Sequence, residues 1–220
     1  MARDCPFGIC DGSGLLVDDD RRSASYCRCH SQVVAARRAR GLSAVIPRKY
    51  RDLSFEQPPI TEIRSSIVSQ VRSFATKVDK SLDEGRGLWL FGPVGTGKTS
   101  LAMLVSSAAL SAGRSVAIYS LPRLLAEIRT TFEDSSSSSY SEFLDRLAAV
   151  DLLHIDDVGA EKTSEWVLEQ LYAIINQRYE DERSIVITTN LDQPELTIQI
   201  GQRTVSRLEE MCEVLPVSGP

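Results

Sequence analysis

The sequence predicts an α/β domain of three layers with a parallel sheet, preceded by a small cysteine-rich module. An apolar strand, residues 87–91, runs directly into a glycine-rich loop and then into an apolar helix that ends near residue 112. Further apolar strands alternate with helices, which is the pattern of a right-handed parallel sheet covered on both faces. Four of the five cysteines lie within the first 29 residues, ahead of that pattern.

The composition bounds the class of protein. The 220 residues give room for one ordinary domain and a small appendage, and 42% apolar with 25% charged residues excludes a disordered or fibrous chain. No run approaches the ~18 apolar residues of a transmembrane helix, and the first residues lack the apolar core of a signal peptide. We therefore expect a cytoplasmic protein without a membrane partner.

The net charge of −5 is an average over two different segments. Residues 1–51 carry ten basic side chains and five aspartates, a balance of +5, so residues 52–220 carry −10. Such asymmetry predicts two modules with different partners. Within the basic segment, residues 31–40 are predicted to form a short helix, whose arginines contact nucleic acid or an acidic partner, or form a solvated face.

The cysteines form two close pairs. Four residues separate Cys5 from Cys10, one separates Cys27 from Cys29, and His30 follows directly. Four thiolates in two pairs predict a closed tetrahedral zinc site, in which His30 could replace Cys29. A segment of about 30 residues cannot bury a useful core, so the metal would supply its folding energy. The alternative is a set of unliganded thiols in a flexible tail.

The glycine-rich loop fits the phosphate-binding pattern GxxxxGK[ST] in its strand–loop–helix context. Its backbone N–H groups and the start of the following helix would surround the phosphates of a nucleotide. Lys98 would reach the β- and γ-phosphates, and the Thr99 hydroxyl would bind Mg²⁺. The residues expected to contact the nucleotide are Gly92, Pro93, Val94, Gly95, Thr96, Gly97, Lys98, Thr99 and Ser100.

A second apolar strand, residues 150–157, ends in two carboxylates. We expect Asp156 to hold Mg²⁺ at the strand end and Asp157 to polarise the attacking water. Asp151 at the strand start lies too far away to share this role. His154 sits inside the apolar run and is interpreted as a packed strand residue, not a catalyst.

A third strand, residues 184–190, ends in Asn190, whose amide would orient the water or sense the γ-phosphate, or would only begin a turn. Strands at 114–120 and 213–217 complete the predicted sheet. Ligands of such sheets bind at the carboxyl ends of the strands, where the glycine-rich loop, Asp156 and Asn190 all fall.

Two arginines lie on the predicted helix 201–212. Arg203 and Arg207 are one turn apart, and both point away from the apolar stripe of that helix. Paired arginines beyond the third strand are suited to reach the γ-phosphate of a neighbouring subunit, where such a finger is worth ~10³–10⁵ in rate. The alternative is two solvated arginines.

Trp166 falls roughly 130° away from the apolar stripe of the predicted helix 163–183. With Lys162 and Ser164 beside it, this ring could stack on a nucleic-acid base, a contact worth ~1–3 kcal/mol, or pack against another local element. Residues 135–139, a run of serines between two amphipathic helices, are predicted to form a loop.

Five segments, in order, resemble the DnaC/DnaI/IstB group of AAA+ ATPases. They are IPRKYRDLSF (46–55), GPVGTGKT (92–99), LLHIDDVGAEKTSEW (152–166), IVITTN (185–190) and RTVSRL (203–208). The resemblance implies an AAA+ phosphate-loop fold of the ASCE type over residues 46–220. The paired cysteines look like the zinc-bearing region of some replicative helicase loaders, which implies a zinc-binding, helicase-interacting module at residues 1–45.

The family implies an ATPase that assembles as a spiral, binds single-stranded DNA in its channel and delivers a hexameric replicative helicase. By position, Lys98 and Thr99 match its nucleotide loop, Asp156 its metal carboxylate and Asn190 its first sensor. Asp157 stands where many AAA+ proteins have Glu, so we expect slow hydrolysis. The expected cofactors are ATP, Mg²⁺ and Zn²⁺.

The resemblance also assigns roles outside the nucleotide loop. Arg207 matches the arginine finger that acts on a neighbouring subunit, with Arg203 as its helper, and Ser164 and Trp166 fall where such loaders face DNA. The sequence ends at Pro220, before the arginine that commonly follows the last strand of the family. An ATPase partner of a transposase is the alternative function. A small-molecule kinase and an adaptor with a structural ATP site are more distant ones.

Overall fold

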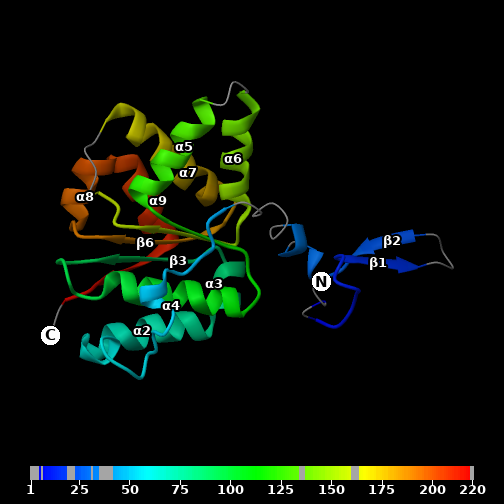
Figure 1. Cartoon of the computed structure of the whole chain (residues 1–220), viewed down its shortest axis with the longest axis horizontal. Helices are drawn as coiled ribbons and strands as arrows, with labels where there is room; N and C mark the ends of the chain where they lie inside the picture. Colours follow the sequence, from blue (N-terminus) through cyan, green and yellow to red (C-terminus); the bar gives the residue numbers. More distant parts are fainter. Residues whose placement is uncertain are drawn as a thin grey trace.

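A parallel sheet of five strands forms the centre of the structure, a computed structural model that describes residues 5, 7–18, 23–30, 32–34, 42–133, 137–159 and 164–218. The strand order is β4-β5-β6-β3-β7, and every neighbouring pair is parallel. Helices cover both faces of this sheet (Figure 1), and a small antiparallel ribbon lies to one side. The predicted three-layer α/β fold is confirmed.

The strands of the large sheet are β3 Gly87–Phe91, β4 Val116–Ser120, β5 Leu152–Asp156, β6 Ser184–Thr189 and β7 Cys212–Pro216. One face packs on α2 Ser65–Thr76, α3 Val78–Asp83 and α4 Lys98–Ser111. The other carries α5 Leu121–Glu133, α6 Ser137–Ala149, α7 Glu165–Glu180, α8 Gln193–Ile200 and α9 Gln202–Met211. The small ribbon pairs β1 Leu15–Asp18 with β2 Ser23–Tyr26. In the described part of the chain, no helix combines the length and apolarity needed to cross a membrane.

Two clusters of buried apolar residues lie one on each face of the sheet, and a third, small one contains Cys5, Cys27 and Cys29. The helix that follows the glycine-rich loop, α4, is buried along much of its length because it lies between the sheet and α2. The five predicted strands of the domain all form, with ends that shift by one or two residues. Because β3, β5 and β6 are neighbours, their carboxyl ends meet at one edge, which is where the sequence places the site.

Three predictions about helices need correction or fall outside the described residues. Residues 137–139 belong to α6 and do not form a loop, so the helical pattern of that segment extends into the serine run. The helix predicted at 163–183 begins at Glu165, because the Ser164 hydroxyl accepts from the Val167 N–H at 3.3 Å. Of the basic helix predicted at 31–40, residues 32–34 are helical, and the rest lie outside the described residues.

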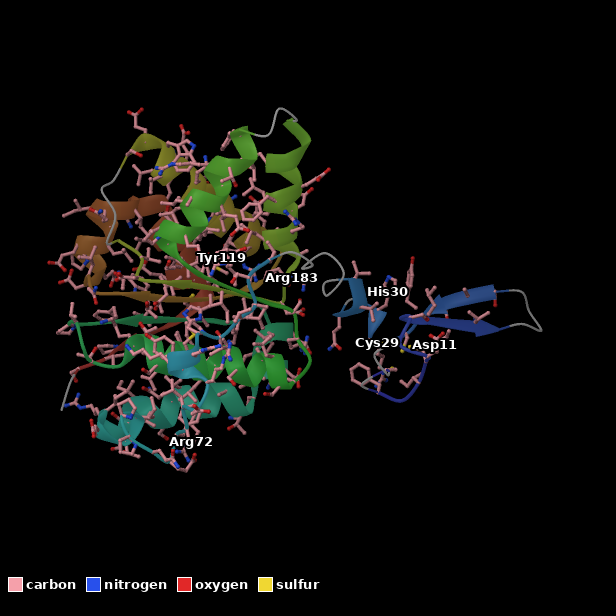
Figure 2. All side chains as sticks on the ribbon, viewed as in Figure 1. Asp11, Cys29, His30, Arg72, Tyr119 and Arg183 are labelled. Carbon is pink, nitrogen blue, oxygen red and sulfur yellow. The ribbon has the colours of Figure 1, made fainter. Side chains whose placement is uncertain are left out.

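The segment before the domain is fastened to the edge strand β4. The Ile118 N–H donates to the Ser43 carbonyl at 2.6 Å, and the Ser43 N–H donates to the Tyr119 hydroxyl at 3.2 Å. Leu42 is buried in the same cluster as α5 and α6. Figure 2 shows Tyr119 in the body of the domain, on the side where this segment enters. This contact gives the exposed edge of the sheet a partner.

A buried arginine holds the amino ends of the strands together. Arg178 on α7 is fully buried. Its two terminal nitrogens donate to five backbone carbonyls at 2.5–3.4 Å, those of Leu147, Ala148, Val150, Asp151 and Ser184. Burial lowers the pKa of this guanidinium, because desolvation penalises its charge. The carbonyls offset that cost, and Arg178 in turn satisfies them.

We predict that Arg178→Met lowers the free energy of unfolding by about 2–4 kcal/mol, because several buried carbonyls lose their donor. Arg183→Met is the matched control. Arg183 lies near the same end of α7, is one-third exposed and pairs with Asp151 at 3.3 Å. Its removal is expected to cost about 1 kcal/mol or less. Urea unfolding of both variants checks the prediction. An equal loss of unfolding free energy in the two variants would contradict it.

Candidate functional site

The glycine-rich loop after β3 depends on two glycines with positive φ. Gly92 has φ of 143°, and a Cβ there would lie 2.2 Å from the Val217 carbonyl oxygen. Gly97 has φ of 89°, and a Cβ there would lie 2.4 Å from the Ile63 side chain. A side chain at Gly92 would displace backbone, and one at Gly97 would displace the Ile63 side chain and require a strained φ. The loop is therefore folded tightly against the end of the chain and the segment before α2.

Lys98 begins α4 and turns back over the loop. Its Nζ donates to the carbonyls of Gly92 and Pro93, each at 2.7 Å. Burial lowers the pKa of Lys98, and the charges of Asp157 and Asp156 oppose that shift. A buried ammonium beside a helix start, with loop N–H groups around it, is the arrangement that binds phosphate.

The Asp156 carboxylate ends β5 and accepts two hydroxyl hydrogen bonds at the same oxygen. Thr99 Oγ1 on α4 donates to Asp156 Oδ1 at 2.9 Å, and Thr188 Oγ1 on β6 donates to it at 2.6 Å. A carboxylate beside a threonine hydroxyl is the oxygen donor set that Mg²⁺ takes together with phosphate and water. The structure thus brings together the two side chains that the sequence predicts for this ion.

Asp157 has an unusual backbone, with φ of 60°. Its N–H donates to Thr188 Oγ1 at 2.9 Å, and its Oδ1 accepts from Asn190 Nδ2 at 3.0 Å. These bonds hold a non-glycine residue in the left-handed region, a conformation that is common at functional sites. The Asn190 amide thus contacts the carboxylate next to Asp156, and its predicted role toward the γ-phosphate stays a prediction.

Two other residues of this strand stay outside the site. His154 is fully buried, and its Nδ1 shares a 2.9 Å hydrogen bond with the Ser106 hydroxyl. Burial lowers the pKa of this imidazole to about 4, so it is neutral. Asp151 lies at the other end of β5 and accepts from the N–H and hydroxyl of Ser115. Both observations agree with the sequence interpretation.

The two arginines of α9 differ in their surroundings. Arg203 is exposed, whereas Arg207 lies over the ring of Tyr179, with its Cζ 4.1 Å from the ring centroid. Among the described residues, neither arginine pairs with the glycine-rich loop, Asp156 or Asn190. Arg207 instead contacts Asn176 and Tyr179 of α7 and Glu210 of its own helix.

The four predicted cysteine ligands lie together. The sulfurs of Cys5, Cys10, Cys27 and Cys29 are all within 4.8 Å of one another, and the cluster could hold a metal ion. Cys5 and Cys27 are 3.8 Å apart, and Cys10 and Cys29 are 3.4 Å apart. The fourth member of the group is Cys29. His30 lies beside the cluster, and its Nδ1 is buried without a hydrogen-bond partner among the described residues.

Backbone N–H groups between residues 7 and 10 favour the thiolate form of Cys5, the form that binds metals. The N–H groups of Cys10, Ile9 and Phe7 face the Cys5 sulfur and lower the pKa of its thiol to about 6. Burial and its neighbouring thiols raise the pKa of Cys29, as expected for sulfurs crowded together without a cation. The donor chemistry of the cluster thus fits a soft or borderline metal such as zinc.

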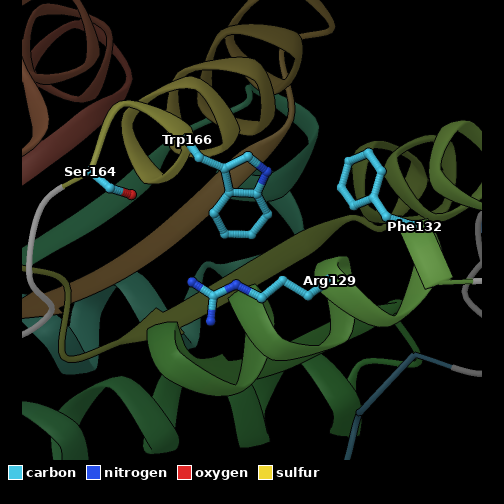
Figure 3. Close-up of a pocket in the computed structure, with 4 residues that line it drawn as sticks. All are labelled: Arg129, Phe132, Ser164 and Trp166. Carbon is cyan, nitrogen blue, oxygen red and sulfur yellow. The ribbon is translucent and has the colours of Figure 1, made fainter.

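A shallow pocket of about 460 Å³ lies between α5 and the start of α7. Figure 3 shows Arg129 and Phe132 of α5 facing Ser164 and Trp166. Trp166 is half-buried against the core and has the Arg129 guanidinium 4.8 Å from its ring centroid, so it packs locally and still faces the pocket. Phe132 is 55% exposed and stacks on Tyr140 at 4.6 Å. Lys162, predicted beside Trp166, lies outside the described residues.

Residues 37–219 match the profile of the IstB-like ATP binding proteins. The chain belongs to this family. Its resemblance to the DnaC/DnaI/IstB group is likewise borne out by curated relatives and solved structures. The replicative helicase loader DnaC of Buchnera aphidicola subsp. Baizongia pistaciae is 29% identical over 161 residues, and that of Escherichia coli K12 is 27% identical over 161 residues. Each alignment covers 72% of this chain and 64% of the relative, so the chain spans less than two thirds of these relatives.

Solved structures give the same assignment of fold. A crystal structure of the DnaC helicase loader matches with a TM-score of 0.67 at 25% identity, covering 78% of this chain and 100% of that one. The initiator DnaA bound to AMPPCP and single-stranded DNA matches with a TM-score of 0.65 at 22% identity, covering 79% of this chain and 51% of that one. DnaI matches with a TM-score of 0.61 at 22% identity, covering 79% and 95%. The chain therefore has the AAA+ fold.

Several side chains of this IstB-like ATP-binding domain escape sequence reasoning. Thr188 bridges the two carboxylate residues; it lies two positions before Asn190 on a strand, so the alternation of side chains could have indicated it. Arg129 and Phe132 carry no such signal, because they meet Trp166 only through the packing of α5 against its neighbours.

Replacing Thr188 with Val keeps the side-chain shape and removes the hydroxyl. We expect Mg²⁺-dependent ATP binding to weaken by about 10- to 100-fold, because Asp156 loses a donor and the Asp157 N–H loses its acceptor. Thr189→Val is the matched control, since Thr189 is also buried and accepts only from the Leu191 N–H at 3.1 Å. Binding of a fluorescent ATP analogue, measured as Mg²⁺ is titrated, gives the affinity of both variants. Equal weakening of ATP binding in the Thr188 and Thr189 variants would contradict the bridging role.

Proposed function

We propose that the protein is a cytoplasmic, ATP-dependent loader of the replicative DNA helicase that binds single-stranded DNA and hands the hexameric helicase to it. One observation carries the proposal: the domain is similar in sequence to DnaC helicase loaders and matches the whole chain of a solved one. The nucleotide site supports it, because the loop, Asp156 and Asn190 meet at one edge of the sheet.

The proposed chemistry is slow hydrolysis of ATP. The loop and Lys98 bind the β- and γ-phosphates, and Thr99 and Asp156 hold Mg²⁺, which neutralises the charge on the phosphates when bound. Asp157 orients the attacking water, and Asn190 orients Asp157. A carboxylate one methylene shorter than Glu reaches less far toward the γ-phosphate. We therefore expect stimulation of the ATPase rate by a partner or by DNA to matter more to this protein than to one with Glu at this position.

We propose that copies of the chain assemble as a spiral in which Arg207 reaches the γ-phosphate held by a neighbour. The cation would stabilise the charge that develops in the transition state. Arg203, exposed one turn earlier, would assist it. The observation that supports this is the position of Arg207 away from the nucleotide site of its own chain.

We propose that residues 1–45 form a zinc module that contacts the helicase, and that residues 46–220 form the ATPase domain. Zinc bound to four sulfurs at about 2.3 Å separates them by about 3.8 Å, which matches the distances in the cluster. The metal would be structural, because four sulfurs leave no open position. The module also exposes apolar side chains suited to a partner, namely Phe7, Ile9, Val17 and Tyr26.

We propose that the pocket between α5 and α7 takes a base of single-stranded DNA. Trp166 and Phe132 offer ring faces, and Arg129 supplies the positive charge for the backbone, with Ser164 at its margin. An acidic domain binds nucleic acid through such local groups and not through its overall field. Lys162, which lies outside the described residues, is predicted to add a second cation.

The alternative function is that of an IstB-like ATPase helper of a transposase. The family match supports this alternative, because the matching family is defined by IstB-like proteins and both functions share the ATPase core. The cysteine cluster favours the loader, since it adds a module outside that core.

Capture by the purified full-length chain separates these functions. We expect it to retain the replicative helicase of its source in the presence of ATP and Mg²⁺. A Cys5→Ser, Cys27→Ser variant is expected to lose that binding at least tenfold, because the module unfolds without metal. Retention of a transposase instead of the helicase would favour the alternative function. Unchanged helicase binding by the cysteine variant would overturn the role of the module.

Metal analysis tests the cysteine cluster directly. The full-length chain is expected to carry one zinc per copy, and Cys27→Ser to lose it. Cys212→Ser is the matched control, because Cys212 is buried in β7 away from the cluster and burial raises the pKa of its thiol. Zinc that remains bound in the Cys27 variant would show that these sulfurs are not the ligands.

Trp166→Ala is expected to weaken binding of single-stranded DNA by about tenfold, because a stacked base is worth ~1–3 kcal/mol. Trp166→Phe keeps a ring face and should lose less. Ile198→Ala removes an apolar side chain that is 85% exposed on α8 and serves as the surface control. Fluorescence anisotropy of a labelled oligonucleotide gives the affinities, and an unchanged Trp166→Ala affinity would remove the stacking proposal.

A further inference from the structure

The guanidinium of Arg207 is held from three sides. Its Cζ lies 4.1 Å from the centroid of the Tyr179 ring, and its Nε donates to Asn176 Oδ1 at 3.3 Å. Its Nη1 lies 3.7 Å from Glu210 Oε1. Both Tyr179 and Asn176 stand on α7, one turn apart, so two helices fix this one side chain. Nη2 has no acceptor among the described residues, which leaves that end of the guanidinium available.

Glu210 links the ring to the cation. The Tyr179 hydroxyl donates to Glu210 Oε2 at 2.5 Å, while the other oxygen of the same carboxylate faces Arg207. This hydrogen bond raises the pKa of Tyr179, so the phenol remains a donor over the ordinary pH range. The ring, the carboxylate and the guanidinium therefore fix one another's positions.

Arg203 provides the contrast within the same helix. It lies one turn before Arg207, is exposed, and has no ion pair or ring contact among the described residues. An exposed arginine loses more side-chain entropy when it binds an anion than one that is already held. The structure thus distinguishes two arginines that the sequence presents as a pair.

We propose that Tyr179 is a positioning residue, which with Asn176 and Glu210 holds Arg207 in the orientation that binds the γ-phosphate on a neighbouring copy. The inference rests on the proposed function, in which Arg207 acts between subunits. Tyr179 itself touches no nucleotide: it restricts the guanidinium to one arrangement in which the Nη2 end remains available. Pre-organisation of this kind raises the rate of the chemical step without changing how tightly a subunit binds its own ATP.

A double-mutant cycle on the full-length chain tests the proposal. We expect Tyr179→Ala to lower kcat by about five- to tenfold with little change in KM, as loss of one cation–π contact implies. In the Arg207→Ala background, the same change should have no further effect, because Tyr179 acts only through Arg207. An equal factor in both backgrounds would mean a general structural role and would overturn the proposal.

Three further variants sharpen the result. Tyr179→Phe keeps the ring face and is expected to retain at least half of kcat, whereas Tyr179→Leu keeps apolar bulk without the ring and should behave like the Ala variant. Tyr172→Ala, two turns earlier on α7, removes another half-buried tyrosine and should leave kcat unchanged. A Leu variant with the wild-type kcat, or a Tyr172 variant as slow as the Tyr179 variant, would count against the proposal.

The cycle also separates this inference from the function on which it rests. If Arg207→Ala leaves kcat unchanged, the action of Arg207 between subunits is wrong, whatever Tyr179 does. If Arg207→Ala lowers kcat and Tyr179→Ala does not, only the positioning role is wrong. The affinity of each variant for a fluorescent ATP analogue should equal that of the wild type, because the nucleotide loop of the same chain is untouched.

Discussion

The Asp156 carboxylate is the point at which the functional parts of this fold are joined. One of its oxygens accepts hydrogen bonds from Thr99 at the start of α4 and from Thr188 in the next strand. Thr188 also accepts from the N–H of Asp157, whose side chain contacts Asn190. These bonds connect the loop after β3 with the ends of β5 and β6. Displacing Asp156 would therefore disturb Thr99 at the end of the glycine-rich loop, Asp157 and Asn190 together.

The two ends of the sheet meet different physical demands. At the amino end, Arg178 is buried and donates to five carbonyls through its two terminal nitrogens, and Arg114 pairs with Asp79 and Asp83 at 2.6 and 2.8 Å, so these charged groups are paired within the chain. At the carboxyl end, Lys98 donates to two loop carbonyls and Asp156 accepts from two threonine hydroxyls, partners that phosphate and Mg²⁺ can replace. The contacts at the amino end of the sheet stabilise the domain. The side chains at the carboxyl end can replace their hydrogen-bond partners with a ligand.

Much of the fold and of the nucleotide site is predictable because the signals are local. Strand, loop and helix follow one another within 25 residues at the glycine-rich loop, and β4, β5 and β6 are apolar runs with a polar end. What escapes prediction depends on contacts between distant segments. The ring of Tyr179 meets Arg207 only because α7 packs on α9, and Arg129 meets Trp166 only because α5 lies beside the start of α7. The burial of the whole Arg178 side chain is of the same kind, since its acceptors come from two separate segments, residues 147–151 and Ser184.

The central claim is that a complete ATPase site needs two copies of the chain, one that binds the nucleotide and one that supplies Arg207. Mixing the Lys98→Ala and Arg207→Ala proteins tests it most directly, because each variant lacks a different half of the site. Each alone should hydrolyse ATP far more slowly than the wild type, while equal amounts should regain about a quarter of the wild-type ATPase rate, since random head-to-tail assembly restores that share of the interfaces. A mixture no faster than the sum of its two components would contradict the claim.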